Sequence, residues 1–299
     1  MKRTELAINT DFYGEDPRLE TLEHTLQLIA EAGFTHIHWC HEWDGDYMYS
    51  VYEMKQIREW MDSCHLHAKS LHATKGTRRN VVMRDGHFRR DFTSDWEYNR
   101  KAGVELIQNR VDLAACLGAS DIVLHLYVPF QTIQDNLTAK EHFYQQAEKS
   151  MDELQPYCLE RGIRICLENL FDMPGDCVLE LFDRLLGKYP KEFLGICLDT
   201  GHANMTWHEE LCKIIRQYKE RIYTIHLHDN FGDSDSHALP GEGNINWENV
   251  MRALAESAYE PPLLLELCYY EKDPADFLRR AYEAGEKLDA MFQDHRKQK

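Results

Sequence analysis

Acidic and histidine residues stand at the ends of several short apolar segments of this chain. The positions concerned are His72, His125, Glu168, Asp199, His226 or His228, and Glu266. One such residue would need no special explanation, because a buried histidine is usually structural and an acid at a strand end usually caps the next helix. Carboxylates that converge repel one another unless a cation lies among them. Six positions at the same level therefore predict a metal site with oxygen and nitrogen ligands, which suits Zn²⁺, Mn²⁺, Co²⁺ or Fe²⁺.

The smallest ligand set takes one residue from each of the last four segments. It consists of Glu168, Asp199, His226 and Glu266. His228 competes with His226, because side chains two residues apart in a strand face the same way, and spacing alone leaves both open. Asp235 and His237 form a further Asp-x-His pair in a turn-rich loop, for which a solvated turn is the ordinary interpretation.

The elements that must position these residues follow a regular alternation of apolar and amphipathic segments. The expected strands cover residues 6–9, 34–39, 67–72, 121–126, 163–168, 194–199, 222–228 and 263–267. Expected helices include residues 18–32, 96–117, 139–160 and 207–221, with Gly33, Gly118 and Gly162 where left-handed caps are common. Several strands are rich in Ile, Leu and Val, as expected when both faces are covered.

Eight strand–helix units in 299 residues predict an α/β fold, a single-domain (β/α)8 TIM barrel over residues 1–299. The open doubly wound sheet is the alternative, but no G-x-G-x-x-G follows the first strand, so its dinucleotide-binding version lacks support. In a barrel, the carboxyl ends of the strands meet on one rim. The fold would therefore bring the candidate ligands together.

Charge and composition restrict the classes of partner and location. The chain has 34 basic and 51 acidic side chains, a formal charge of −17, which argues against general nucleic-acid binding. No run of about 18 apolar residues occurs, so no membrane span is expected. Nine cysteines without C-x-x-C spacing, and no signal peptide at the start, favour the cytoplasm.

The motifs together resemble those of the xylose isomerase-like barrels, which include sugar isomerases, sugar epimerases and endonuclease IV-type apurinic endonucleases. The resemblance extends from the first expected strand to Glu266. It rests on Leu167-Glu168-Asn169, Leu198-Asp199-Thr200-Gly201-His202, His226-Leu227-His228-Asp229, Pro240-Gly241-Glu242-Gly243 with Trp247, and Glu266. Relatives of this kind often form homo-oligomers, although the sequence offers no interface signal.

The epimerase-type members imply a role for each matching residue. The residues matching Glu168, Asp199, His226 and Glu266 hold one divalent ion there, which favours His226 over His228 by resemblance. The two glutamates serve as acid and base on opposite faces of the substrate, and the residue matching His202 contacts the sugar. Many of these epimerases carry an arginine shortly after the histidine of strand seven. Residues 230–233 contain no arginine, so it is in doubt whether this chain binds substrate oxygens in the way those epimerases do.

The endonuclease IV pattern is the second implication of the resemblance. It uses nine ligands for three zinc ions, and the matching positions are His72, His125, Glu168, Asp199, His202, His226, Asp235, His237 and Glu266. All nine carry a suitable residue. The surroundings of the early positions differ from that family, and the acidic charge opposes DNA binding.

The chemistry expected of a single-ion site is proton transfer next to a carbonyl. A metal that binds a carbonyl and its adjacent hydroxyl acidifies the C–H between them and stabilises the resulting enediolate. Glu168 and Glu266 could remove and return the proton, which gives a sugar, sugar-acid or sugar-phosphate isomerase or epimerase. Loss of a leaving group from the same enediolate would make a keto-sugar lyase. A regulatory sugar-binding barrel without turnover is a further alternative.

Other residues near the expected rim could bind the substrate. The segment after the third strand carries six basic residues, Arg78 and Arg79 among them, against one acid, Asp85, through residue 90. Arginine forks match phosphate or carboxylate groups, while a solvated loop is the equal alternative. Trp43 would supply an apolar wall for a sugar ring. His72, His125 and His202 complete the expected substrate contacts.

Overall fold

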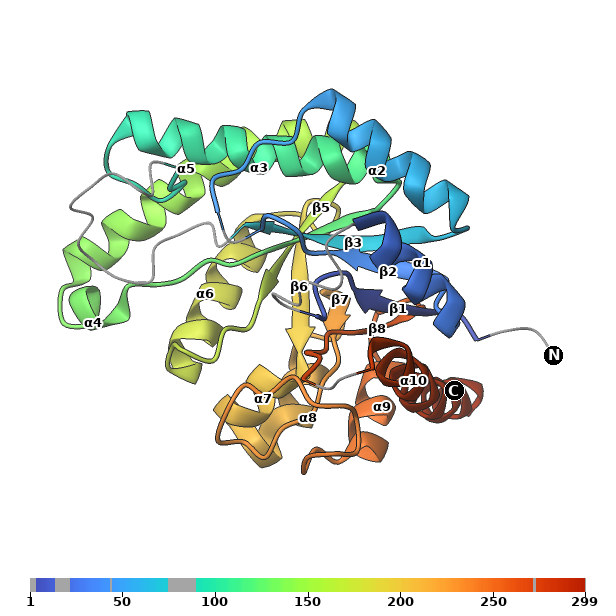
Figure 1. Ribbon diagram of the computed structural model, residues 1–299. Coiled ribbons are helices and arrows are strands. Elements are labelled where there is room, and N and C mark those ends of the chain that lie inside the picture. Colours follow the sequence, from blue (N-terminus) through green and yellow to red (C-terminus); the bar gives the residue numbers. More distant parts are fainter. Residues whose placement is uncertain (1–3, 14–21, 44, 75–89, 271–272, 299) are drawn as a thin grey trace.

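The strands of the computed structural model form one parallel sheet that curls into a barrel (Figure 1). The structure describes residues 4–13, 22–43, 45–74, 90–270 and 273–298. The strands are β1 (Leu6–Asn9), β2 (His36–Trp39), β3 (His67–Thr74), β4 (Asp121–Leu124), β5 (Arg164–Glu168), β6 (Leu194–Asp199), β7 (Ile222–His226) and β8 (Leu263–Leu265). The strand order is β7-β6-β5-β4-β3-β2-β1-β8.

The two ends of this sheet, β7 and β8, meet just beyond the end of β7. Leu227 forms a parallel bridge with Leu265, its N–H donates to the carbonyl of Leu264 at 3.0 Å, and its carbonyl accepts from Glu266 N at 3.2 Å. This contact makes an eight-stranded, nearly closed (β/α)8 TIM barrel and confirms the predicted fold class. It also places residue 266 beside the end of β7.

Helices cover the outside of the barrel (Figure 1). They are α1 (Leu22–Ala32), α2 (Val51–Ser63), α3 (Glu97–Leu117), α4 (Phe130–Ile133), α5 (Leu137–Arg161), α6 (Gly175–Lys188), α7 (Thr200–Trp207), α8 (Leu211–Gln217), α9 (Trp247–Ala255) and α10 (Pro274–Lys297). Gly118 and Gly162 end α3 and α5 in left-handed conformations, φ 80° and 66°, as the sequence predicts. Within the described ranges, no helix is both long and apolar enough to cross a membrane.

The helix expected over residues 207–221 is present only over Leu211–Gln217, as α8, so its bounds are wrong. A helix, α7, already begins at Thr200, because the Asp199 side chain accepts from the His202 N–H at 2.7 Å and caps its start. His208 has φ 45°, which ends that helix, and a 3₁₀ turn at His208–Glu210 leads into α8. The chain thus turns into a helix directly at the rim.

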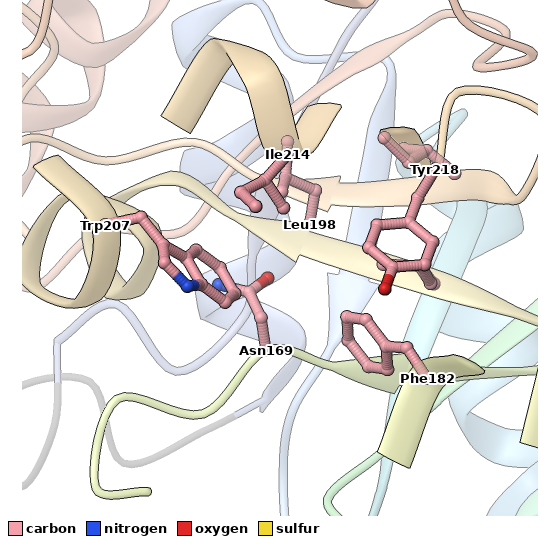
Figure 2. Close-up of a pocket in the computed structure, with 8 residues that line it drawn as sticks. Asn169, Phe182, Leu198, Trp207, Ile214 and Tyr218 are labelled. Carbon is pink, nitrogen blue, oxygen red and sulfur yellow. The ribbon is translucent and has the colours of Figure 1, made fainter. Parts of the chain in front are cut away.

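Apolar packing fills the space between the sheet and its helices. Figure 2 shows one place in this packing, where the side chains between β6 and the helices α6, α7 and α8 leave a narrow gap. Its lining is Asn169, Phe182, Ile196, Leu198, Trp207, Ile214, Tyr218 and Ile222. The gap is too narrow to admit a water molecule, so it belongs to the core and is no binding pocket. Asn169 connects it to the rim described next.

Candidate metal centre

Four ionisable side chains converge where β5, β6, β7 and β8 end. Glu168, Asp199 and His226 are the last residues of their strands, and Glu266 directly follows β8. One ligand atom from each of the four lies within 4.8 Å of the others, and all four residues are buried. Parallel pairing explains the convergence, because Asp199 is in register with His226 and Glu168 with Cys197. The four ligands expected from the sequence therefore lie together.

The contacts within this group are those of ligands facing a common point. His226 Nδ1 lies 3.0 Å from Glu266 Oε2, 3.6 Å from Glu168 Oε2 and 3.8 Å from Asp199 Oδ2. His228 also points inward, but its Nε2 lies 3.0 Å from Asp199 and it belongs to a different group. The geometry thus supports His226 rather than His228 as the fourth member of the set.

A second group, His72, His125 and Glu168, adjoins the first through its shared glutamate. His125 Nε2 is 2.9 Å from Glu168 Oε2, and His72 Nε2 is 3.7 Å from the same oxygen. The ring of Trp43 stacks on His72, with centroids 4.2 Å apart and planes at 21°. The predicted aromatic wall therefore lies against this group.

A third group lies on the other side of Asp199 and consists of His202, His228, Asp235 and His237. Asp235 Oδ2 lies 3.3 Å from His202 Nε2 and 3.2 Å from His237 Nε2. The rings of His228 and His237 stack at 4.0 Å. Asp235 and His237 thus face the centre and do not form the solvated turn that their local sequence suggests.

The electrostatics of the centre fit a cation. Burial by itself would raise the pKa of Glu168, but the charges of His125 and His226 hold it well below its usual value. The pKa of Glu266 is also well below its usual value, because His226 and His72 outweigh the effect of burial. Without an ion, protons on His202, His226 and His237, whose pKa values the neighbouring carboxylates raise, offset part of the negative charge.

Several buried imidazole nitrogens in the centre lack ordinary partners. Nε2 of His226 and Nδ1 of His72 and His228 have no hydrogen bond within the described part of the chain, and Nδ1 of His226 and of His202 face carboxylate oxygens at 3.0 Å without hydrogen-bond geometry. Buried polar atoms normally find a hydrogen-bond partner, so unpaired nitrogens beside carboxylates are what a metal site looks like before its ion is added. The donor set of imidazole and carboxylate groups suits Zn²⁺, Mn²⁺ or Co²⁺.

Hydrogen bonds from neighbouring residues hold the ligands in place. Asn169 bridges β5 and β6, since its amide accepts from Asp199 N at 2.8 Å and donates to Asp199 O at 2.9 Å. Thr200 Oγ1 is hydrogen-bonded to the His228 backbone, accepting from its N–H at 3.1 Å and lying 2.9 Å from its carbonyl. Such outer contacts fix the orientation of metal-binding side chains.

Asp229 anchors the loop that carries the third group. Its two carboxylate oxygens accept from the backbone N–H groups of Asn230, Gly241 and Ile245 and from Trp247 Nε1, at 2.8–3.2 Å. A buried carboxylate with four donors fixes the Pro-Gly-Glu-Gly turn beside the barrel. The resemblance included this turn without revealing that Asp229 secures it.

Sequence reasoning missed His38, and some of its predictions concern residues that the structure does not describe. His38 on β2 is fully buried, and one of its ring nitrogens groups with His72, His226 and Glu266. Its only signal in the sequence is a polar residue inside an apolar strand. Arg78 and Arg79 lie outside the described residues, so their predicted contact with an anionic group stays a prediction.

Comparisons with known proteins agree with the fold. The model of the xylose isomerase-like TIM barrel family matches residues 26–291, and the chain belongs to that family. The uncharacterized protein y4fM of Sinorhizobium fredii is 32% identical over 283 residues, covering 91% of this chain and 90% of that protein. Fructoselysine 3-epimerase of Shigella flexneri is 24% identical over 217 residues, covering 70% of this chain and 71% of the enzyme. A solved D-tagatose 3-epimerase-like protein shares the fold with a TM-score of 0.72, at 22% identity and 99% coverage of both chains.

Proposed function

We propose that this protein is a divalent-metal-dependent isomerase or epimerase of a sugar or sugar derivative. The observation that carries the proposal is the paired arrangement of Glu168 and Glu266 on strands separated by β6 and β7. Each glutamate has an imidazole nitrogen near each of its two oxygens. Two buried carboxylates that reach one group of ligand atoms from different strands suit removal and return of a proton. Similarity to sugar 3-epimerases supports a sugar as the substrate.

The residues of this chain would divide the work as follows. Glu168, Asp199, His226 and Glu266 would hold the ion, which polarises a carbonyl and its neighbouring hydroxyl when bound. Glu168 or Glu266 would accept the proton from the carbon between them, and the low pKa of each keeps it ionised at neutral pH in the ion-free protein. The other glutamate would return a proton to the opposite face, and because it too is ionised it must first take that proton up from solvent.

The neighbouring groups would bind and orient the substrate. His125 and His202 each contact Glu168, on different oxygens, at 2.9 and 3.0 Å, so they fix the direction in which this carboxylate faces. Trp43 lies against His72 and offers a flat apolar surface to a sugar ring. His72, His125 and His202 are the donors placed to reach sugar hydroxyls.

Proton exchange at the substrate carbon tests this proposal. The Glu266→Gln variant keeps the shape of the side chain but cannot accept a proton, so exchange should fall by about a factor of 100 or more. The measurement is deuterium incorporation from solvent into a panel of ketoses and keto-acids. Glu160→Gln, an exposed acid on α5, serves as the control. Undiminished exchange in the Glu266 variant would remove this residue from the role.

A trinuclear zinc phosphodiesterase is the second candidate, favoured by one specific observation. The nine expected ligands fall into three neighbouring groups that share Glu168 or join through Asp199. Metal analysis separates the two candidates: one ion per chain supports the epimerase, whereas three ions together with incision of an abasic-site duplex support the phosphodiesterase. Deuterium exchange that yields neither an isomerised or epimerised sugar nor an incised duplex would indicate a lyase instead.

A further inference from the structure

His38 lies beneath the candidate centre and has no role in the function proposed above. It sits on β2 with 0% exposure, and its ring centroid is 4.8 Å from that of His226 and 5.2 Å from that of His72. A ring nitrogen of His38 lies within 4.8 Å of ligand atoms from His72, His226 and Glu266. This set differs from the four strand-end ligands, because it contains three imidazoles and only one carboxylate.

The hydrogen bonds of His38 leave one nitrogen free for a ligand. Nδ1 lies 2.7 Å from Ser70 Oγ, and that hydroxyl lies 3.4 Å from Thr224 Oγ1. Nε2 is buried and has no hydrogen-bond partner among the residues that the structure describes. If Nδ1 donates to Ser70 and Ser70 donates to Thr224, Nε2 presents a bare lone pair. Metal-binding histidines are commonly held in this way, by a hydrogen bond from the nitrogen that does not bind.

A buried imidazole with an unpaired nitrogen is costly unless something binds it. Leaving a buried polar atom unsatisfied costs on the order of 1–3 kcal/mol. The candidate ligands nearest to His38 are His72, His226 and Glu266, and an ion bound among them could contact its unpaired nitrogen. His226 and Glu266 belong both to this set and to the set with Glu168 and Asp199. An ion could therefore lie closer to the carboxylates of one set or to the imidazoles of the other.

We propose that His38 is a further metal ligand, which binds through Nε2 and gives the centre a preference for nitrogen-seeking ions. The inference rests on the metal centre of the proposed function but not on its reaction. Imidazole ligands suit Zn²⁺, Co²⁺ and Ni²⁺, whereas carboxylate and water ligands suit Mn²⁺ and Mg²⁺. His38 would therefore determine which ion the protein takes up when several are available.

Binding of Co²⁺ and of Mn²⁺ to chelator-treated protein, measured by calorimetry without any sugar, tests the proposal. The His38→Ala variant should bind Co²⁺ about tenfold or more weakly than the wild type, a loss typical of disturbed ligand spheres. Its affinity for Mn²⁺ should change by less than about threefold, because oxygen ligands dominate for that ion. His36→Ala is the matched control, since His36 lies on the same strand but contacts Thr35 and His67.

Anomalous diffraction from wild-type crystals soaked in Co²⁺ tests the same assignment without any substitution, in case the variant does not fold. A cobalt peak about 2.1 Å from His38 Nε2 would support the proposal. A peak lying only among Glu168, Asp199, His226 and Glu266, or equal losses of Co²⁺ and Mn²⁺ affinity, would overturn it. Absence of sugar turnover would leave this result untouched and count against the proposed function alone.

Discussion

At the scale of single residues, the centre is a balance between buried negative charge and imidazole protons. Glu168, Asp199 and Glu266 are almost inaccessible to water, and such carboxylates need positive charge close by. Burial would lower the pKa of His226, but Cys197, Glu266 and Glu168 together raise it well above its usual value. The ion-free centre therefore carries a proton where the occupied centre would carry a metal.

Metal binding should consequently release protons. His226 must be neutral to bind an ion, so the proton that its raised pKa retains has to leave. Affinity should rise with pH up to the pKa of His226 in the ion-free protein, by about a factor of ten per unit for each proton released. Calorimetry in two buffers of different ionisation enthalpy measures the number released. A heat of binding that is identical in both buffers would contradict the expectation.

Individual site residues differed in how far the sequence could reveal them. Glu168, Asp199 and Glu266 were predictable, because parallel strands end at one rim, whereas spacing left His226 and His228 open and only the resemblance favoured His226. His38 was not, since a histidine inside an apolar strand looks the same whether it binds a ligand or merely packs. Asp235 depends on how the loop after β7 folds back, and three hydrogen bonds to Asp229 from residues distant in the sequence hold that path.

At the scale of elements, the start of α7 is pressed against the centre. A Cβ atom placed on Gly201 would lie 2.0 Å from Cε1 of His228. That ring has little freedom to move, because it contacts Asp199 at 3.0 Å and stacks on His237. The absence of a side chain at residue 201 therefore allows α7 and the ring of His228 to pack this closely.

The Gly201→Ala variant should be less stable and should distort the third group. Overpacking of this kind costs about 1–3 kcal/mol in the free energy of unfolding, which urea denaturation measures. Gly187→Ala in α6 is the matched control, because no described heavy atom lies within 4 Å of its Cβ position. Alanine is the better helix former, so the control should gain up to about 1 kcal/mol. Equal stability of the two variants would show that the His228 ring moves aside without lowering the free energy of unfolding.

The bounds of some elements follow from the local sequence pattern, and those of others do not. The strands are predicted nearly to the residue at β1 and β6, where apolar runs end in a polar residue. The region after β6 is misjudged because Asp199, assigned as a ligand, also caps a helix through the His202 N–H. The Asp199 carboxylate is thus both a candidate metal ligand and a helix cap, and the sequence analysis predicted only the first.

At the scale of the whole molecule, acid should weaken the barrel through a histidine far from the rim. Burial lowers the pKa of His36 to about 4, with the nearby His67 adding to the effect. Between about pH 6.5 and 4 the unfolded chain binds a proton at this residue that the folded chain does not. Stability therefore falls as the pH drops through this window.

The His36→Gln variant should lose less stability on acidification than the wild type. The comparison is the urea midpoint of ion-free protein at pH 7.5 and at pH 5, where the proton difference at residue 36 is present in every protein that keeps His36 and absent from the His36→Gln variant. His24→Gln, on α1, provides a control of the same chemistry. A midpoint that falls equally in all three proteins would assign the acid sensitivity to other groups.

The position of β1 between β2 and β8 has a consequence for biosynthesis. A nascent chain leaving the ribosome displays β1 early, yet the neighbour on its other side is made almost last. Glu266 emerges directly behind that final strand, so the last carboxylate of the centre arrives when translation of the barrel is nearly over. Loading of the proposed ion would accordingly follow synthesis, and a ribosome stalled before residue 263 would hold a polypeptide that lacks Glu266.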